Sequence, residues 1–520
     1  MLKGHPKGLL AAALSNMGER FGYYIMNAVL VLFLCSKFGL DDKVAGIIYS
    51  FFYFSIYILS LPGGIIADKL QNYKGTIQAG LMTMAVGYII LSIPIMATPA
   101  NRIGLLVLTC AALLVIAFGN GLFKGNLQAI VGQMYDNFEA EAAKEGPEAL
   151  EIAKTKRDPG FQIFYVFINI GGLIAPFIAP TLRKWWLGVN NMSYDAALPK
   201  LCHLFIDKGA DAMTADQLSN LTELMTKANP AGVADMAAAC SDYLNVFNTG
   251  VHYSFIASVA AMLISLLIFL CTKKNMPNPV KKVAQSSQDY TPEEKASMAK
   301  EIRQRMTGLY AVLGICVFFW MSFHQNGESL SFFARDFVNT STIAPEIWQA
   351  VNPCFVILLT PVIMWVFGTK WGRKISTPRK IAVGMGIAGL AYVFLVLVSF
   401  FKGYPSAPEF LAQPVAAQAG MKSGAWVLIV TYFFLTVAEL FISPLGLSFV
   451  SKIAPKHIQG ICQGLWLCAT AVGNLLIMLG PIFYNHMPKL WLCWLIFAVV
   501  CAIAMIVMFG MLKWLERITA

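Results

Sequence analysis

Apolar stretches of about 20 residues, the length that crosses a bilayer as an α-helix, recur along the whole chain and constrain its fold more than any other feature. The composition agrees, because 57% of the 520 residues are hydrophobic and 13% are charged. Soluble domains carry about 25% charged residues. We therefore predict an all-α membrane protein. The predicted transmembrane helices lie near 14–36, 43–67, 76–97, 103–124, 160–182, 250–271, 306–334, 346–368, 379–401, 424–450, 458–484 and 489–513.

The formal net charge of +11 is distributed unevenly along the chain. With the N-terminus in the cytoplasm, the inward segments carry about twice as many Lys and Arg residues as the outward ones, as the positive-inside rule expects. We therefore predict that both termini are cytoplasmic, and that the basic charge reflects topology rather than a nucleic-acid partner. The first apolar segment is too long for a signal-peptide core and is interrupted by Glu19 and Arg20, so we expect it to remain as the first helix.

Four charged residues lie within apolar segments: Glu19 and Arg20 in the first, Lys124 at the end of the fourth and Glu439 in the tenth. A charge at bilayer depth costs roughly 2.5–3.5 kcal/mol even on lenient insertion scales, and such residues usually line a cavity or pair with one another. They mark a polar pathway and indicate a transporter.

A polar, basic segment at 273–305 separates two sets of six predicted helices. Within it, Thr291, Pro292 and Glu294 form a capping-box pattern that predicts a helix running into the seventh segment. This layout resembles the major facilitator superfamily, in which substrate binds near the membrane midplane between the halves. We predict an N-terminal bundle (1–182 and 249–272), an extracytoplasmic insert (183–248), a cytoplasmic linker (273–305) and a C-terminal bundle (306–520).

The loop between the second and third helices reads GIIADK over 64–69, with Asp68 near its end. It is similar to the superfamily's GxxxD[RK] motif, although an ordinary charged turn would read the same way.

The insert 183–248 is the longest outward segment. Thr214 and Gln217 form a capping box, and apolar residues follow at helical spacing, so we expect two or three short helices that act as a packing cap. Cys202 and Cys240 both lie in it; they either form a disulfide in an oxidising compartment or remain two free thiols.

Four segments resemble signatures of the proton-coupled oligopeptide transporter family, known as the POT or PTR family. They lie in helices one, four, five and ten, and a fifth match lies in helix eight. In order they are NMGERFGYY at 16–24 (family ExxERFxYY), FKGN at 123–126 (FKPN), FQIFYVFINIGG at 161–172 (FxxFYxxINxG), ELFISPLGLS at 439–448 (ELxxSPxGLS), and WQAVNP at 348–353.

A transporter of many small peptides has to recognise what they share, namely two charged termini and the amide backbone. Lys124 supplies a cation for the carboxylate and Glu439 an anion for the ammonium group. Without peptide the two would form an ion pair between the halves, worth about 4 kcal/mol at ~4 Å and an effective dielectric near 20, which would act as a gate. The tyrosine and tryptophan side chains in these motifs either line the peptide site or only pack between helices. The resemblance implies that peptide is bound by Tyr23, Tyr24, Asn27, Lys124, Asn169, Asn352, Glu439, Ser443 and Trp466.

The chain departs from the family at three positions. The first glutamate of the helix-one motif is Asn16, the usual arginine of YYxMRA is Asn27, and the usual glutamate of FEQxGxSL is His324. An acid follows His324 at Glu328, where helical spacing would let it stabilise a protonated imidazole. Our hypothesis is that His324 and Glu328 carry proton coupling together with Glu19 and Arg20; the alternative is a neutral His324 in a helix interface.

We therefore predict a secondary active transporter of the plasma membrane, the inner membrane in a Gram-negative bacterium, that imports di- and tripeptides by alternating access with protons as the coupling ion. It is expected to act as a monomer in the bilayer, without metal or other cofactor, and not as an enzyme. Two alternatives stay open. One is a transporter of the same fold for a modified peptide, an amino-acid conjugate or another organic anion, and the other is a membrane-bound receptor or enzyme that works through the insert.

Overall fold

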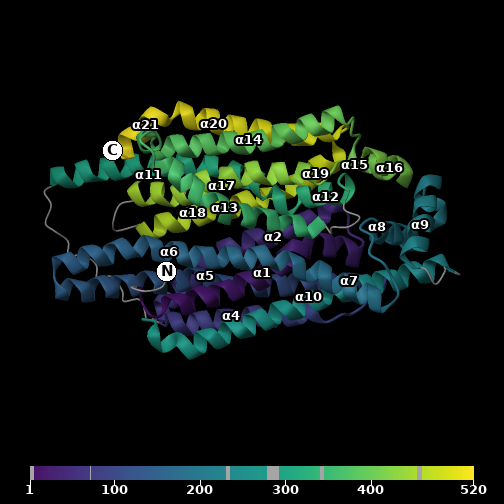
Figure 1. Cartoon of the computed structure of the whole chain (residues 1–520), viewed down its shortest axis with the longest axis horizontal. Coiled ribbons are helices and arrows are strands. Elements are labelled where there is room, and N and C mark those ends of the chain that lie inside the picture. Colours follow the sequence, from purple (N-terminus) through teal and green to yellow (C-terminus); the bar gives the residue numbers. More distant parts are fainter. Residues whose placement is uncertain are drawn as a thin grey trace. The chain divides into compact units, whose positions relative to one another are not determined.

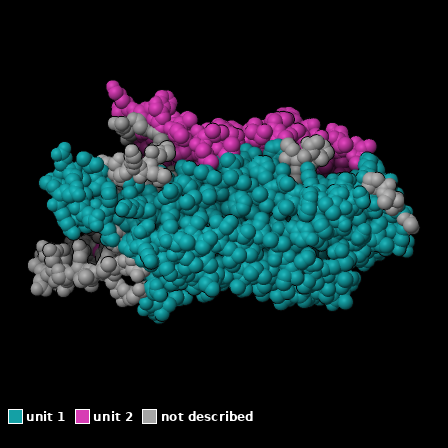
Figure 2. Space-filling model, turned by 60° about the horizontal axis from the view of Figure 1, so that its bottom comes forward, with its two compact units in different colours: residues 1–281, 341–353 teal, residues 282–340, 354–520 magenta. Residues whose placement is uncertain are grey.

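The computed structural model describes residues 5–70, 72–229, 233, 235–277, 292–339, 345–453 and 459–519. Helices make up nearly all of this part of the chain (Figure 1). The pairing between extended segments is limited to two isolated bridges, Val338 with Ser423 and Pro405 with Lys489. The chain folds into two compact units, coloured separately in Figure 2.

Unit 1 comprises Met1–Lys281 and Ser341–Pro353. Its helix α1 packs against α10 and α6, and α4 packs against α5 and α10, so the core of the unit lies among these helices. The elements are α1 (Leu9–Phe38), α2 (Asp42–Ile58), α3 (Ser60–Leu70), α4 (Tyr73–Ser92), α5 (Arg102–Glu145), α6 (Pro147–Ile174), η1 (Ala175–Phe177), α7 (Ile178–Val189), α8 (Leu198–Lys208), η2 (Ala210–Ala212), α9 (Ala215–Ala228), α10 (Met236–Thr272), η3 (Lys273–Asn275) and η5 (Pro345–Ala350).

Unit 2 comprises Lys282–Thr340 and Cys354–Ala520. Its core is formed where α14 packs against α17 and α20, and where α11 packs against α18. The elements are α11 (Pro292–Phe323), η4 (His324–Gly327), α12 (Ser329–Asp336), α13 (Val351–Gly368, which begins in unit 1), η6 (Gly372–Lys374), α14 (Thr377–Phe401), α15 (Ala407–Leu411), α16 (Val415–Met421), α17 (Trp426–Ile453), α18 (Gln459–Leu475), η8 (Leu476–Met478), α19 (Leu479–His486), α20 (Leu490–Gly510) and α21 (Leu512–Thr519).

Eleven helical segments in the described ranges are long and apolar enough to cross a membrane. They correspond to eleven of the twelve predicted segments. The eighth, 346–368, consists of η5 followed by α13, and its apolar helical part, Val351–Phe367, is shorter. The all-helical membrane architecture predicted from hydropathy is thereby confirmed.

The boundaries differ from the prediction where a helix continues beyond the apolar stretch or changes type within it. Helix α5 has 44 residues, because the segment after the apolar stretch is rich in Ala and Glu, which favour helix. The predicted span 306–334 is broken, since α11 ends at Phe323 and a 3-10 turn, η4, precedes α12. Helix α11 begins at Pro292 as predicted; Thr291 and the linker residues 278–291 lie outside the described residues.

Between α7 and α10 the described residues form two short helices, α8 and α9, joined by η2. The predicted insert 183–248 was too long, because its first residues belong to α7 and its last to α10. The predicted capping box is present: Gln217 N donates to the Thr214 hydroxyl, and the Gln217 side chain accepts from Thr214 N. Helix α8 packs against α9 and against α10. In Figure 1 these helices lie at the end of unit 1 opposite the chain's N-terminus.

Candidate functional site

A buried ion pair in α1 is the centre of the site in unit 1. Arg20 donates from Nε to Glu19 Oε2 over 2.6 Å and from its terminal nitrogen to Oε1 over 2.7 Å. Both side chains are buried, with Glu19 0% and Arg20 4% exposed. A carboxylate and a guanidinium lose their hydration on burial, so each needs charged or polar partners in the protein. Asn120 of α5 supplies a further partner by donating to Glu19 Oε1 over 2.6 Å.

Lys124 lies one helical turn beyond Asn120 on α5, so the two side chains share the helix face that meets the ion pair. Its ammonium group sits 4.3 Å from the centre of the Tyr57 ring, within cation–π range. Glu19 and Arg20 both act on it electrostatically. The three charged residues predicted from helices one and four therefore converge within unit 1.

Tyrosine rings form a wall beside these charges. The Arg20 guanidinium lies 4.7 Å from the Tyr23 ring centre, and Tyr23 lies edge-on to Tyr24 with centroids 5.3 Å apart. The Tyr23 hydroxyl donates to Asn27 Oδ1 over 3.3 Å. Tyr23 also stacks on Tyr53 of α2, with centroids 6.4 Å apart.

The α2 contribution to this wall was not predicted. Tyr49, Tyr53 and Tyr57 follow one another at intervals of four residues, and neighbouring rings lie 5.5 and 5.9 Å apart. The i, i+4, i+8 spacing in the sequence was a usable signal, because it places the three rings on one helix face.

Asn169 and Asn352 belong to unit 1 as well. Asn169 is buried on α6, and the start of α13 carries a partly exposed Asn352. One turn after Asn169, a Cβ at Gly172 would lie 3.1 Å from the Tyr24 ring and 3.2 Å from Pro353. Helix α6, Tyr24 and the start of α13 are therefore in close contact. The side chains of Phe161, Gln162 and Tyr165 in the same motif, like that of Asp68, lie outside the described residues.

In unit 2, aromatic rings surround His324. The imidazole stacks on Trp320 with centroids 5.2 Å apart and an interplanar angle of 17°, and Trp320 lies edge-on to Trp466 at 6.4 Å. Trp466 covers Gly446 of α17 so closely that a Cβ there would overlap the indole. Glycine at 446 is what lets the indole lie on α17.

The break in the seventh span changes the relation of His324 to Glu328. His324 begins the 3-10 turn η4, and Glu328, which is buried, lies at the junction with α12 with φ −125° and ψ −84°. The α-helical i, i+4 relation assumed from the sequence is therefore wrong. Non-helical backbone at membrane depth is tolerated mainly where it is buried in protein or borders a water-filled cavity, and broken helices bear the binding sites of many transporters.

Glu439 and Ser443 lie one turn apart on α17 and are each partly exposed. The side chains of Pro444, Ser448 and Lys452 in the same motif lie outside the described residues. Lys124 belongs to unit 1 and Glu439 to unit 2.

Many apolar helices of membrane-crossing length, with charged side chains buried among them, define a multi-pass membrane transporter. The model of the family described as "POT family" matches residues 74–289 and 280–489. The chain therefore belongs to the POT family.

Curated relatives cover most of the chain. A peptide transporter of Yersinia enterocolitica, YePEPT, is 27% identical over 494 residues, which is 91% of this chain and 86% of that protein. The dipeptide and tripeptide permease A of Salmonella typhimurium is 25% identical over 482 residues, covering 91% and 83%.

Solved structures share the fold. A variant of the peptide transporter POT in complex with alafosfalin has a TM-score of 0.69 at 21% identity, covering 100% of this chain and 96% of that one. A POT family transporter in complex with a thioalcohol-conjugated peptide has a TM-score of 0.68 at 20% identity, covering 100% and 98%. The helical fold of this chain is therefore that of POT family transporters, as the sequence motifs predicted.

Proposed function

We propose that this chain imports di- and tripeptides by alternating access, driven by protons that move inward with the substrate. The observation that carries the proposal is the cluster of Glu19, Arg20, Asn120 and Lys124, where a titratable carboxylate and a second cation lie beside one another in a buried setting. Its relatives named as peptide transporters and as dipeptide and tripeptide permeases support the substrate class.

In this mechanism Lys124 binds the peptide carboxylate. Its ammonium contacts the π-face of Tyr57 and lies near the Arg20 guanidinium, so an incoming carboxylate gains charge-assisted hydrogen bonds there. Protonation of Glu19 weakens its pairing with Arg20 and leaves a second cation for the same carboxylate. Proton uptake and peptide binding thereby favour one another, which is the coupling that a symporter requires.

The amino end of the peptide is assigned to Glu439, with Ser443, Asn169 and Asn352 as further polar contacts. Tyr23, Tyr24 and Trp466 provide aromatic surface for variable side chains, and Asn27 orients Tyr23 through their hydrogen bond. We place both termini in the cytoplasm and α8 and α9 on the outer side, and we propose that a monomer is sufficient.

The test is uptake of labelled Ala-Ala into proteoliposomes with and without an imposed pH gradient, acid outside. We expect accumulation only with the gradient. Lys124→Ala should abolish uptake, because truncating a charge that pairs with a buried ligand charge costs about 2–5 kcal/mol. Lys144→Ala, an exposed lysine on the same helix, is the matched control. Gradient-driven uptake by a folded Lys124→Ala protein would overturn the assignment.

A second candidate is a transporter of the same mechanism for a modified peptide, an amino-acid conjugate or another organic anion. Asn27 and His324 favour it, because they stand where the family carries an arginine and a glutamate. POT family structures hold a thioalcohol-conjugated peptide and 5-aminolevulinic acid, so the family's fold accommodates such ligands. Competition of Ala-Ala uptake by these compounds would distinguish the two: inhibition by a conjugate at lower concentration than by any dipeptide favours the second candidate.

A further inference from the structure

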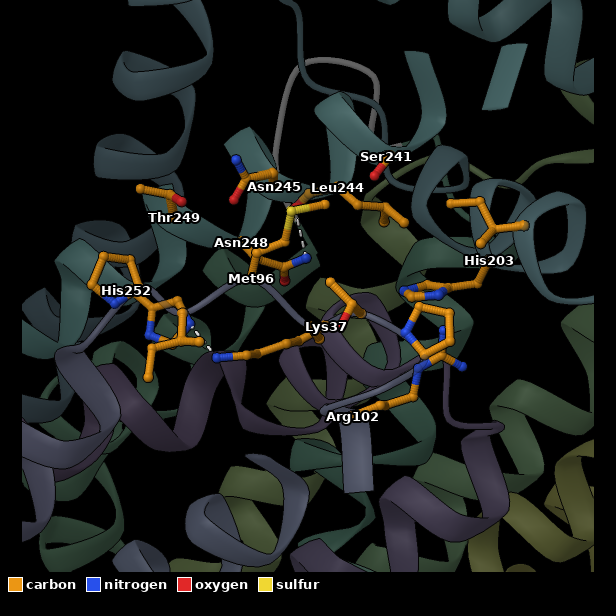
Figure 3. Close-up of a pocket in the computed structure, with 16 residues that line it drawn as sticks. Lys37, Met96, Arg102, His203, Ser241, Leu244, Asn245, Asn248, Thr249 and His252 are labelled. Atoms are coloured by element: carbon orange, nitrogen blue, oxygen red, sulfur yellow. Dashed lines mark hydrogen bonds between the residues drawn. The ribbon is translucent and has the colours of Figure 1, made fainter. Parts of the chain in front are cut away.

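A cavity with both apolar and polar walls lies in unit 1, at the end where α1 finishes. It has a volume of about 70 Å³, enough for roughly five water molecules at about 10–15 Å³ each. Its walls are the end of α1, the segment 94–99, the start of α5, and the facing sides of α8 and α10. None of the substrate or proton residues assigned above lines it. Figure 3 shows Lys37 crossing the floor of this cavity toward His252.

Lys37 and His252 form the most unusual contact in the cavity. The Lys37 ammonium lies 2.6 Å from His252 Nε2, and the residues are 6% and 3% exposed. The other ring nitrogen, Nδ1, contacts the carbonyl oxygen of Leu91 and must donate to it. In the neutral imidazole Nε2 is then the acceptor, so Lys37 donates to His252. The partner of the buried ammonium is a neutral ring and not a carboxylate.

The charge of Lys37 is otherwise uncompensated. Its remaining contacts in the described part of the chain are the rings of Phe33 and Phe38, with centres 5.4 and 5.5 Å away, and no described carboxylate lies within 4.0 Å of its ammonium. A lysine near a helix end usually extends its ammonium into water, but here the side chain is enclosed. A buried charge without an opposite charge is strongly disfavoured, and it is relieved either by loss of the proton or by a counter-ion. The polar side chains of α10 that line the same cavity favour a counter-ion from solution.

Helix α10 faces Lys37 with a polar stripe. Ser241, Asn245 and Thr249 lie on successive turns, line the cavity, and have no side-chain hydrogen bond to another described residue. Asn248, by contrast, donates its amide hydrogens to the carbonyls of Ser36 and Leu244, so it ties α10 to the end of α1 and is not free to bind a ligand. Three uncommitted donors on a helix that is otherwise strongly apolar indicate a polar ligand.

The remaining walls add donors without adding negative charge. Arg102 is held by Asp207 through two contacts of 2.8 Å, and its Nε, which is buried, has no partner among the described residues. His203 donates from Nε2 to the Ser36 carbonyl over 2.8 Å, and burial lowers its pKa, which keeps the ring neutral. The cavity therefore has one unneutralised cation and no lining carboxylate among the described residues.

We propose that this cavity binds a small oxyanion, a carboxylate or phosphate group, through Lys37, with Asn245, the middle of the three free donors on α10, as the second donor. Ser241 and Thr249 are about 12 Å apart along the helix, too far for one such anion to bridge. The volume, enough for a few water molecules, suits an anion of the size of acetate or phosphate. The site is separate from the proposed peptide site, and its test needs no peptide, so the two proposals stand or fall independently.

The experiment is thermal unfolding of the purified protein in lipid-free detergent, with sodium acetate or sodium phosphate replacing sodium gluconate at constant ionic strength. Gluconate carries its carboxylate on a bulkier six-carbon chain and serves as the reference. A ligand that binds only the folded state raises the melting temperature in a saturable way. We expect saturable stabilisation of wild type, at least tenfold weaker in Lys37→Gln and unchanged in Lys208→Gln, an exposed lysine of α8.

If Lys37→Gln does not fold, Asn245→Leu keeps the charge and fills the cavity, and it should also abolish the stabilisation. A phospholipid headgroup could supply the same chemistry. Nanodiscs of phosphatidylglycerol against phosphatidylcholine distinguish this source: stabilisation by phosphatidylglycerol that requires Lys37 identifies the headgroup as the ligand. The proposal is overturned if wild type shows no saturable response to either source, or if Lys37→Gln and Asn245→Leu both respond as wild type does.

Discussion

Asn120 of α5 donates a hydrogen bond to Glu19 of α1 over 2.6 Å, on the oxygen that also accepts from Arg20. This contact joins two helices whose motifs are about a hundred residues apart in sequence. It places the α5 turn that ends at Lys124 against the ion pair. An amide four residues before Lys124 thus positions the carboxylate that we assign to proton coupling.

Asn120→Leu should impair coupling without unfolding the protein. The substitution keeps the branched shape of the side chain but removes a hydrogen bond to a buried carboxylate, worth about 1.5–3 kcal/mol. We expect gradient-driven uptake of Ala-Ala to fall about tenfold or more, while exchange of internal for external peptide, which needs no net proton movement, falls less. Gln128→Ala, exposed on the same helix, is the control. Equal losses of both activities would indicate a general folding defect and contradict the positioning role.

His324→Gln tests whether this imidazole takes part in proton coupling. His324 is buried and stacks on Trp320; a protonated ring in this position gains cation–π energy of about 0.5–2 kcal/mol, so the stack can stabilise the charged form. If the ring titrates during transport, the variant should retain peptide exchange and lose stimulation by an imposed pH gradient. His486→Gln, an exposed histidine of α19, controls for the substitution. Gradient stimulation equal to wild type in His324→Gln would reject the hypothesis.

Much of the fold was predictable because its determinants are local. Apolar length sets each span, and the capping residues at Thr214 and Pro292 set helix starts that the structure reproduces. The charges of helices one and four could also be singled out, since a charge in an apolar segment is visible without any tertiary information.

Features that depend on tertiary packing were not predictable. The polar residues at 324–329 interrupt the apolar pattern of 306–334, but they do not by themselves specify a 3-10 turn. The turn is held by neighbouring helices: Gln325 donates to the Ile477 carbonyl, and Tyr432 donates to the Asn326 carbonyl. The Lys37–His252 contact joins residues 215 positions apart. Such pairs become visible only when the helices are packed.

Gly446→Ala should displace Trp466 and weaken peptide binding. A Cβ at 446 would overlap the indole, so the ring has to move, and overpacking of this kind costs about 1–3 kcal/mol. We expect a lower melting temperature and a several-fold higher KM for Ala-Ala. Gly314→Ala on α11, where a Cβ meets no atom within 4 Å, is the matched control and should behave as wild type. An unchanged KM in Gly446→Ala would remove Trp466 from the proposed site.

Cys202 of α8 and Cys240 of α10 should form a disulfide on oxidation. In the structure both are buried free thiols, and burial, with the neighbouring Cys240, raises the pKa of the Cys202 thiol. Because the protonated thiol is a poor nucleophile, oxidation should be slow without a catalyst. A bridge closing a loop of roughly 40 residues is worth about 4 kcal/mol in the chain-entropy treatment.

We expect copper–phenanthroline to protect two thiols from maleimide labelling after denaturation and to raise the melting temperature of wild type. Cys202→Ser and Cys240→Ser should each show neither effect, whereas Cys110→Ser on α5 should show both. Full labelling of oxidised wild type would contradict the pairing. A disulfide raises the melting temperature only if the loop that it closes unfolds in the same transition as the helical bundle. Protection of both thiols without a change in melting temperature would therefore mean that α8 and the start of α10 stay folded when the bundle unfolds.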